Sequence, residues 1–117
     1  MAYDPDNVFA KILRREIPAD VVFENDFVMA FEDINPQAPV HILIVPKADV
    51  ATVDDFTEEH RELIGEMILA AKAIAREKGI SETGYRLVLN TRQNGGQDVY
   101  HVHLHLIGGR RMTWPPG

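Results

Sequence analysis

Three histidines at alternate positions near the C-terminal end, His101, His103 and His105, are the residues best placed to do chemistry. On a β-strand, side chains two residues apart share a face and lie about 6.5–7 Å from each other. The three imidazoles would then line one face, while the apolar residues between them would face the core. Because histidine is a mediocre strand former, sheet formation alone does not account for three in a row. The spacing therefore favours a functional row.

Two kinds of chemistry could use this row. When one nitrogen of an imidazole is held by a hydrogen bond, the other can act as a nucleophile or as an acid–base group near neutral pH. A pair of histidines on a strand can also bind zinc, with further ligands from elsewhere. On a straight strand His101 and His105 lie about 13 Å apart, too far for one zinc ion with bonds of about 2 Å. The row favours nucleophilic chemistry centred on His103, which has an imidazole on each side.

The segment just before the row suggests an anionic substrate. It reads Asn94-Gly95-Gly96-Gln97. Glycines let backbone N–H groups approach a ligand closely, and consecutive N–H groups can bind an anion. A loose hairpin loop is the alternative interpretation of the same residues.

The elements that would position this row follow from the hydrophobic pattern. Asn7 can cap a short helix over residues 8–15, and a longer helix is predicted over 57–78, followed by Gly79. Residues 91–97 are predicted as a Gly-rich loop. Five strands are predicted, at residues 21–24, 27–32, 40–45, 85–90 and 99–107. The pattern predicts an α+β domain with a mainly antiparallel five-stranded sheet, one long helix and one short helix.

Length and composition are those of one ordinary globular domain. The chain has 117 residues, of which 45% are apolar and 26% are charged, so gross disorder is excluded. The net charge of −6 argues against an extended nucleic-acid surface, because the molecule as a whole would repel phosphates. The absence of cysteine excludes disulfides, thiolate catalysis and Cys-ligated zinc.

Neither a membrane span nor a secretory signal is expected. No apolar run approaches the roughly 18 residues that a membrane-spanning helix needs. Residues 1–7 have neither the basic region nor the apolar stretch of a signal peptide. We therefore expect a cytoplasmic protein without membrane or nucleic-acid partners.

The histidine segment resembles the signature of the histidine triad (HIT) superfamily, in which three histidines alternate with apolar residues. His101-Val102-His103-Leu104-His105-Leu106-Ile107 matches every position of that pattern. The flanking segments are similar to the Hint branch, the histidine triad nucleotide-binding proteins, and the similarity covers nearly the whole chain. The similar segments include residues 9–12, 16–19, 30–39, 95–97 and 114–117.

The resemblance implies a hydrolase of the adenosine 5'-monophosphoramidase type. Such a purine nucleoside phosphoramidase cleaves the P–N bond of nucleoside 5'-monophosphate derivatives through a covalent nucleotidyl-histidine, and it needs no metal or other cofactor. Two alternatives remain close, a dinucleoside polyphosphate hydrolase and a nucleotide-binding interaction module with incidental turnover. A small metal-binding protein that uses the histidine row is a third reading.

The resemblance also assigns catalytic roles. His103 would be the nucleophile that attacks the α-phosphate, and His101 would orient it, partly through its backbone carbonyl. His105 would face the bridging atom and the leaving group. His41, which the pattern alone reads as an ordinary strand residue, would be the fourth histidine of the site.

Nucleotide contacts follow from the same comparison. Asp33 would accept hydrogen bonds from the ribose hydroxyls, a role that suits an acceptor-only carboxylate. Asn90 and the amides near Gly96 and Gln97 would hold phosphate oxygens. The base pocket would be walled by apolar residues that are equally natural as core, namely Phe9, Ile12, Phe31, Ile34 and Leu43.

Three positions depart from the pattern of the Hint branch. Asp98 stands where a serine usually touches the leaving group, and a carboxylate there could favour a cationic amine while repelling phosphate. Asp49 replaces a usual histidine, so no function is expected at that position. Glu32 precedes Asp33 in place of a neutral residue or a histidine, which could change base or ribose contacts.

The resemblance implies a single HIT domain over residues 1–117 that forms a homodimer. The sheets of the two subunits would join, and the tail at residues 109–117 would reach toward the partner's site. Trp114 in this tail is consistent with that, because a tryptophan is costly to leave in water. The alternative is that Trp114 packs on its own subunit.

Overall fold

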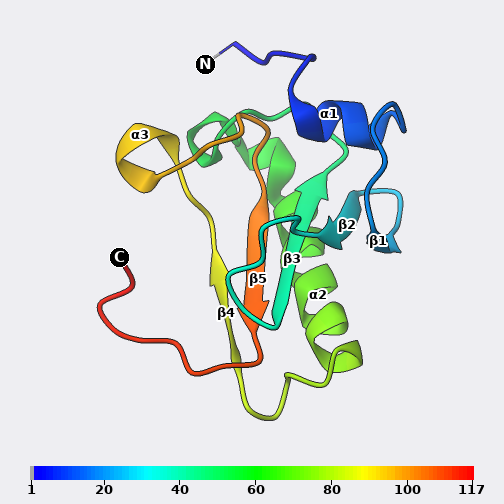
Figure 1. Ribbon diagram of the computed structural model, residues 1–117. Coiled ribbons are helices and arrows are strands. Elements are labelled where there is room, and N and C mark those ends of the chain that lie inside the picture. The colour runs from blue at the N-terminus through cyan, green and yellow to red at the C-terminus, as the bar shows by residue number, and fades with distance from the viewer. Residues whose placement is uncertain (1) are drawn as a thin grey trace.

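The computed structural model describes residues 2–117, and in it five strands form one antiparallel sheet (Figure 1). The strand order is β1-β2-β3-β5-β4, so β5, which carries the end of the histidine row, lies inside the sheet. The predicted α+β class is therefore confirmed. None of the helices in the described range could span a membrane. The strands are β1 (Val21–Glu24), β2 (Val28–Glu32), β3 (Val40–Pro46), β4 (Tyr85–Val88) and β5 (Leu104–Gly108), and the α-helices are α1 (Val8–Leu13), α2 (Arg61–Glu77) and α3 (Arg92–Gly95).

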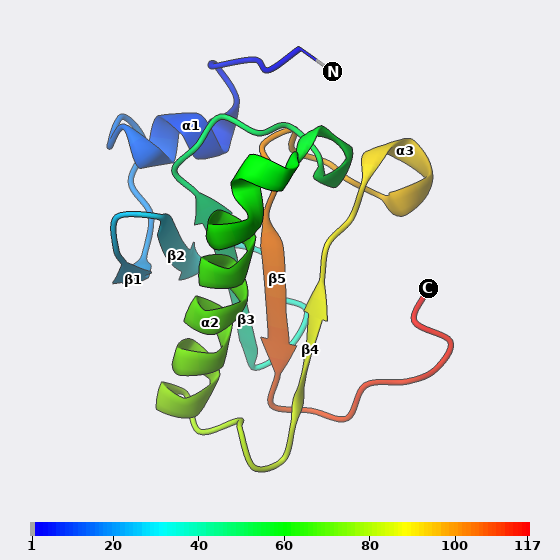
Figure 2. The same cartoon turned by 180° about the vertical axis from the view of Figure 1, so that it is seen from behind.

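The long helix α2 covers one face of the sheet, as the view from behind shows (Figure 2). Its apolar stripe packs against alternate residues of three strands, because side chains two apart on a strand share a face. On β3 and β5 these residues are Ile42, Ile44, Leu104 and Leu106, all of them buried. The register pairs Ile42 with Leu106 and Ile44 with Leu104. This larger core fixes the alignment of the two central strands.

The other face of the sheet packs against the short helix α1. Asn7 begins this helix, since its side chain accepts a hydrogen bond from the amide of Ala10. Phe9 and Ile12 then pack on the residues of β2 and β3 that point away from α2, among them Phe31 and Leu43. Because the histidines alternate with the residues of the larger core, they belong to this second face.

The predicted strand over residues 99–107 is wrong in its first half, because β5 begins only at Leu104. The preceding segment is bonded to the last residue of β3, Pro46, and to the loop that follows it. The amide of Val102 donates to the carbonyl of Val50 at 2.8 Å, and the buried side-chain amide of Gln97 donates to the carbonyls of Ala51 and Val99. These tertiary contacts outweigh the alternating pattern.

Other boundaries differ by smaller amounts. The long helix begins at Arg61, because residues 58–60 form a separate 3-10 turn capped by the Thr57 side chain. Gly79 follows its end with a φ of +76°, as the sequence predicts. The predicted loop at residues 91–97 contains the four-residue helix α3, which ends at Gly96 with a φ of +80°.

Candidate active site

A cavity of about 580 Å³ opens between α1, the end of β2 and the histidine row. Apolar side chains of the second core form its floor, so each of these residues serves both the core and the cavity. Ile34 stands at the rim with its side chain fully exposed. All five residues predicted for the base pocket line this cavity, namely Phe9, Ile12, Phe31, Ile34 and Leu43.

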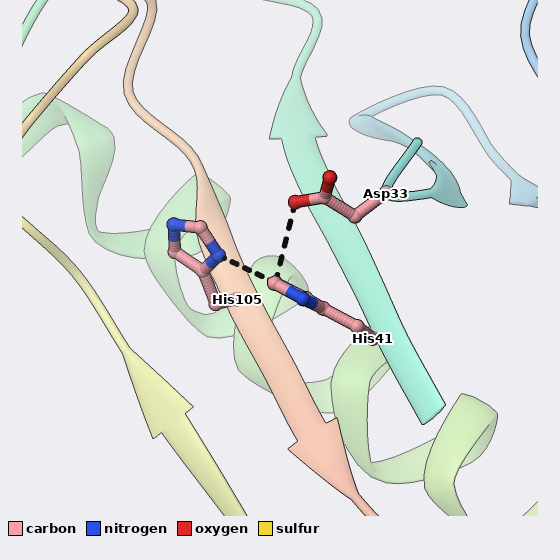
Figure 3. Close-up of side chains that lie close together, drawn as sticks. All are labelled: Asp33, His41 and His105. Atoms are coloured by element: carbon pink, nitrogen blue, oxygen red, sulfur yellow. Dashed lines mark hydrogen bonds and ion pairs between the residues drawn. The ribbon is translucent and has the colours of Figure 1, made fainter. Parts of the chain in front are cut away.

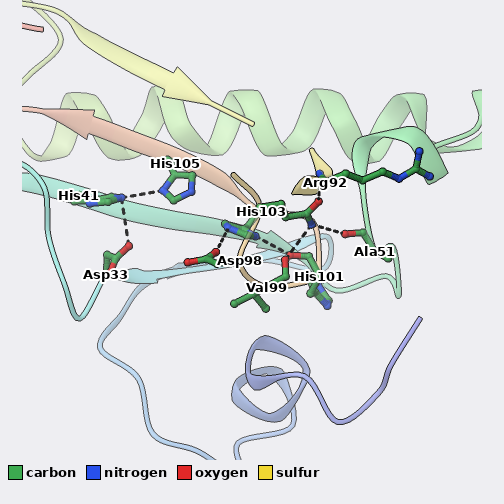
Figure 4. Close-up of polar contacts among 10 residues, drawn as sticks. Asp33, His41, Ala51, Arg92, Asp98, Val99, His101, His103 and His105 are labelled. Carbon is green, nitrogen blue, oxygen red and sulfur yellow. Dashed lines mark hydrogen bonds and ion pairs between the residues drawn. The ribbon is translucent and has the colours of Figure 1, made fainter. Parts of the chain in front are cut away.

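His103 lies between the backbone carbonyl of His101 and the carboxylate of Asp98 (Figure 4). Its Nδ1 lies 2.8 Å from the backbone carbonyl oxygen of His101, the contact expected from the family resemblance. A carbonyl only accepts hydrogen bonds, so Nδ1 carries the proton and Nε2 carries the lone pair. The side chain lines the cavity, and the ring of Phe9 packs against it edge to face at 4.9 Å between centroids.

His101 does not join the other two histidines in the cavity. Its ring is completely buried and lines no part of the cavity. Nε2 donates to the carbonyl oxygen of Pro46 at 2.7 Å. The three imidazoles therefore do not line one cavity, because the His101 ring is bonded to Tyr3 and to Pro46 instead. His101 reaches the cavity only through its backbone carbonyl.

His41 and His105 form a second pair, next to Asp33 (Figure 3). Nε2 of His41 lies 2.9 Å from Nδ1 of His105 and 3.3 Å from an oxygen of Asp33. The amide of Gln37 donates to Nδ1 of His41 at 3.0 Å. The rings of His103 and His105 have centroids 5.0 Å apart. Side chains from β3, β5 and the loop after β2 thus meet at one end of the cavity.

These contacts determine the proton positions in the pair. Since Nδ1 of His41 accepts from Gln37, Nε2 of His41 carries the proton and donates to Nδ1 of His105. His105 then carries its own proton on Nε2. That nitrogen is buried and has no hydrogen-bond partner among the described residues. A buried N–H without a partner is costly, and a ligand in the cavity can satisfy it.

Burial keeps the imidazoles of the row neutral. Desolvation is the largest cause that lowers the pKa of His101, His103 and His105 below the ordinary value. For His105 the pKa falls to about 4, helped by the neighbouring His103 and His41. A neutral His103 keeps the lone pair that a nucleophile needs.

Asp98 reaches His103 because the segment before β5 is bent. One of its carboxylate oxygens lies 3.8 Å from Nε2 of His103, while its side chain remains 84% exposed. It therefore lies at the solvent side of the cavity, which it lines together with Asp20, Glu32 and Asp33. None of the residues lining the cavity is a lysine or an arginine.

Four of the residues predicted to bind nucleotide do not line the cavity: Asn90, Gly96, Gln97 and Trp114. The amides of Gly96 and Gln97 already donate to the carbonyls of Gln93 and Arg92, so this structure does not present them to a phosphate. Trp114 is 81% exposed in the tail.

Sequence reasoning also missed the backbone amide of Gln37, which donates to His41. No residue type could reveal this contact, because it is made by the backbone and not by the side chain.

Asp33, His41 and His105 form the one cluster among the described residues that could hold a metal ion, with ligand atoms within 4.8 Å of one another. The hydrogen bonds argue against that use. A zinc ion on Nε2 of a neutral His41 would require the proton on Nδ1. In this structure Nδ1 accepts a hydrogen bond from the backbone amide of Gln37. With a proton on Nδ1, the N–H of His41 and the N–H of Gln37 would face each other. The cluster is arranged to hold a proton between Nε2 of His41 and Nδ1 of His105, and it does not fit a metal ion.

Comparison with known proteins gives consistent results. Residues 14–112 match the family model described as HIT domain. The chain is 54% identical over 107 residues to purine nucleoside phosphoramidase of Escherichia coli (strain K12), covering 92% of this chain and 90% of that protein. It is 48% identical over 116 residues to a 14 kDa zinc-binding protein of Zea mays, covering 97% and 90%. A crystal structure of a HIT family hydrolase from Legionella pneumophila Philadelphia 1 has a TM-score of 0.92 at 55% identity, covering 94% of this chain and 98% of that one.

Proposed function

This chain belongs to the HIT domain family, and we propose from that membership that it is a purine nucleoside phosphoramidase. The enzyme hydrolyses the P–N bond of nucleoside 5'-monophosphoramidates and releases AMP or GMP. The E. coli relative, 54% identical over most of the chain, carries this activity in its name. The reaction is a hydrolysis at phosphorus with a histidine as the nucleophile.

The position of the His103 imidazole is the observation that carries this proposal. Its Nδ1–H is held by the carbonyl of His101, which leaves the lone pair on Nε2, and the side chain lines the cavity. A ring fixed in this tautomer needs no rearrangement before it attacks, and fixed geometry is a main source of rate acceleration.

The first step transfers the nucleotidyl group to the protein. Nε2 of His103 attacks the α-phosphorus, a new P–N bond forms, and the bond to the leaving nitrogen breaks. The leaving nitrogen takes up one proton at the solvent side of the cavity and departs as an amine. The N–H of His105, which has no hydrogen-bond partner in the described part of the chain, donates to the substrate and stabilises the charge that develops on the phosphoryl group.

The second step returns the enzyme to its starting state. Water attacks the phosphorus of the adduct, the bond to His103 breaks, and its lone pair is restored. The nucleoside monophosphate leaves, and the proton lost by water passes to solvent. The base lies on the apolar floor, and Asp33 accepts hydrogen bonds from the ribose hydroxyls.

Turnover of adenosine 5'-monophosphoramidate by the purified protein tests the function. Mass spectrometry of protein quenched during turnover should find one nucleotidyl group, and peptide mapping should place it on His103. Hydrolysis of dinucleoside polyphosphates at a higher kcat/KM than the phosphoramidate would favour the dinucleoside polyphosphate hydrolase. Binding of AMP without steady-state turnover would favour an interaction module.

We further propose that the protein acts in the cytoplasm as a homodimer. In support of the dimer, β4 is an edge strand, and Tyr85 and Leu89 beside that edge are exposed apolar side chains. The tail with Trp114 then lies toward the partner's site. Sedimentation of the purified protein distinguishes about 26 kDa, twice the mass of the 13.2 kDa chain, from a monomer.

A further inference from the structure

The segment before α1 contacts the histidine row outside the cavity. Oη of Tyr3 lies 2.6 Å from Nδ1 of His101, and the two rings meet edge to face with centroids 5.5 Å apart. Neither residue lines the cavity. His101 is completely buried, so within the described residues its two ring nitrogens depend on Tyr3 and on the Pro46 carbonyl.

The direction of the Tyr3 hydrogen bond follows from the other nitrogen. Nε2 of His101 faces the carbonyl oxygen of Pro46 at 2.7 Å, so it carries the ring proton. Nδ1 is then an acceptor, and the hydroxyl of Tyr3 donates to it. Burial raises the pKa of Tyr3, so the hydroxyl keeps its proton at neutral pH.

We propose that Tyr3 is a positioning residue for the nucleophile. Its hydroxyl and the Pro46 carbonyl hold the His101 ring at both nitrogens, and a ring held at both ends fixes the backbone of its own residue. The carbonyl of His101 is the acceptor for Nδ1–H of His103 at 2.8 Å. Tyr3 therefore acts on His103 through His101, and this inference rests on the nucleophilic role proposed for His103.

The N-terminal segment is itself held in the position that this role requires. The side chain of Asn7 caps α1 and also donates to the carbonyl of Asp4 at 2.7 Å. Two residues after Asn7, in the first turn of α1, Phe9 packs its ring against His103 at 4.9 Å between centroids. The segment that carries Tyr3 and Phe9 thus contacts both His101 and the nucleophile.

Tyr3→Phe tests the proposal, because it removes the hydroxyl and keeps the ring. Ser81→Ala is the control, since it removes a hydroxyl from the exposed turn between α2 and β4, away from the cavity. We expect kcat for adenosine 5'-monophosphoramidate to fall about tenfold in Tyr3→Phe. Removing the residue that orients a metal-binding histidine typically costs about 10–100-fold, and we expect the lower end of that range here. KM should change less than about twofold, because Tyr3 does not line the cavity, and Ser81→Ala should match wild type.

Histidine ¹⁵N NMR of the unliganded protein gives a readout independent of activity. In wild type, His101 should be protonated on Nε2 and His103 on Nδ1. In Tyr3→Phe, the His101 signals should shift or broaden and the Nδ1-protonated form of His103 should lose population. The wild-type spectrum needs no variant to fold, so a His101 protonated on Nδ1 would overturn the proposal by itself.

Two further outcomes also overturn it. One is a Tyr3→Phe enzyme with kcat within twofold of wild type and unchanged histidine signals. The other is a fall in kcat/KM through KM alone, which would indicate general loosening of the site. A wild-type protein that does not turn over the phosphoramidate would refute the proposed function instead, while the NMR result would still report on the contact between Tyr3 and His101.

Discussion

His41 and His105 lie on neighbouring strands without being opposite each other. His41 is paired with Ile107, and His105 is paired with Leu43. The two imidazoles meet diagonally, with Nε2 of His41 2.9 Å from Nδ1 of His105. Diagonal neighbours two residues apart share a face of the sheet, so this contact depends on the register that the larger core imposes on β3 and β5.

Replacing His103 with alanine should abolish turnover while the fold is retained. The change removes Nε2, and with it the covalent route. Steady-state kcat with a phosphoramidate substrate is the measurement, and circular dichroism checks the fold. His60→Ala is the matched control, because His60 lies in the turn before α2 and away from the cavity. A His103→Ala enzyme that keeps more than about a tenth of wild-type kcat, a difference of about 1.4 kcal/mol, would refute the assignment.

Activity should persist below the pH at which an ordinary histidine becomes protonated. Protonation of Nε2 removes the lone pair of His103, and burial lowers the pKa of this residue. The acid limb of kcat/KM should therefore fall below pH ~6.5, the ordinary value for histidine. A profile with its acid midpoint at or above that value would contradict the neutral, buried nucleophile.

The stability of the protein should decrease as the pH falls through the same range. In the unfolded chain His105 titrates near pH ~6.5, whereas in the folded protein its pKa is about 4. Between these values the unfolded state binds more protons, so the free energy of unfolding falls as the pH decreases and is insensitive to this group above pH ~6.5. Thermal unfolding from pH 7.5 to 4.5 measures the slope, and His105→Gln should make it shallower. An unchanged slope in that variant would show that His105 is not the group responsible.

Asp98→Ser should reduce selectivity for cationic leaving groups. The carboxylate lies 3.8 Å from the attacking nitrogen of His103, and opposite charges 4 Å apart attract by about 1 kcal/mol in water. We expect kcat/KM for a phosphoramidate with a cationic amine to fall about fivefold more than for one with a neutral amine. Asp26→Ser, at the exposed turn before β2, is the control. Equal effects on both substrates, or none, would mean that Asp98 is a solvated carboxylate without a role in selectivity.

Chelators should not inhibit the enzyme. The only metal-competent cluster in the described part of the chain has His41 in the wrong tautomer, because its Nδ1 accepts from Gln37. Activity should survive prolonged treatment with EDTA, and elemental analysis of protein purified without a His tag should find no stoichiometric zinc. Loss of activity in EDTA with recovery on adding zinc would overturn the metal-free mechanism, and the name of the maize relative makes this a necessary test.

The sequence predicted the five-stranded sheet correctly, but not the positions of the three imidazoles relative to the cavity. Hydrophobic alternation places Leu104 and Leu106 in the core correctly, because those positions lie within a regular strand. The same alternation does not reveal that the His101 ring lies outside the cavity, where it is bonded to Pro46 and Tyr3. Only the resemblance indicated that His41 belongs with the histidine row, since no local sequence pattern reveals which strands pair.

The floor of the cavity has an evolutionary consequence. Phe9, Phe31 and Leu43 are core residues as well as cavity walls, and truncating a buried side chain of this size typically costs about 2–5 kcal/mol. Substitutions that widen the floor for a different nucleobase would therefore lower the free energy of unfolding, which is small for a single domain. Exposed rim positions such as Ile34 and Asp98 carry no such penalty. Substrate preference should therefore diverge through the rim, while the floor stays constant among enzymes that act on different molecules.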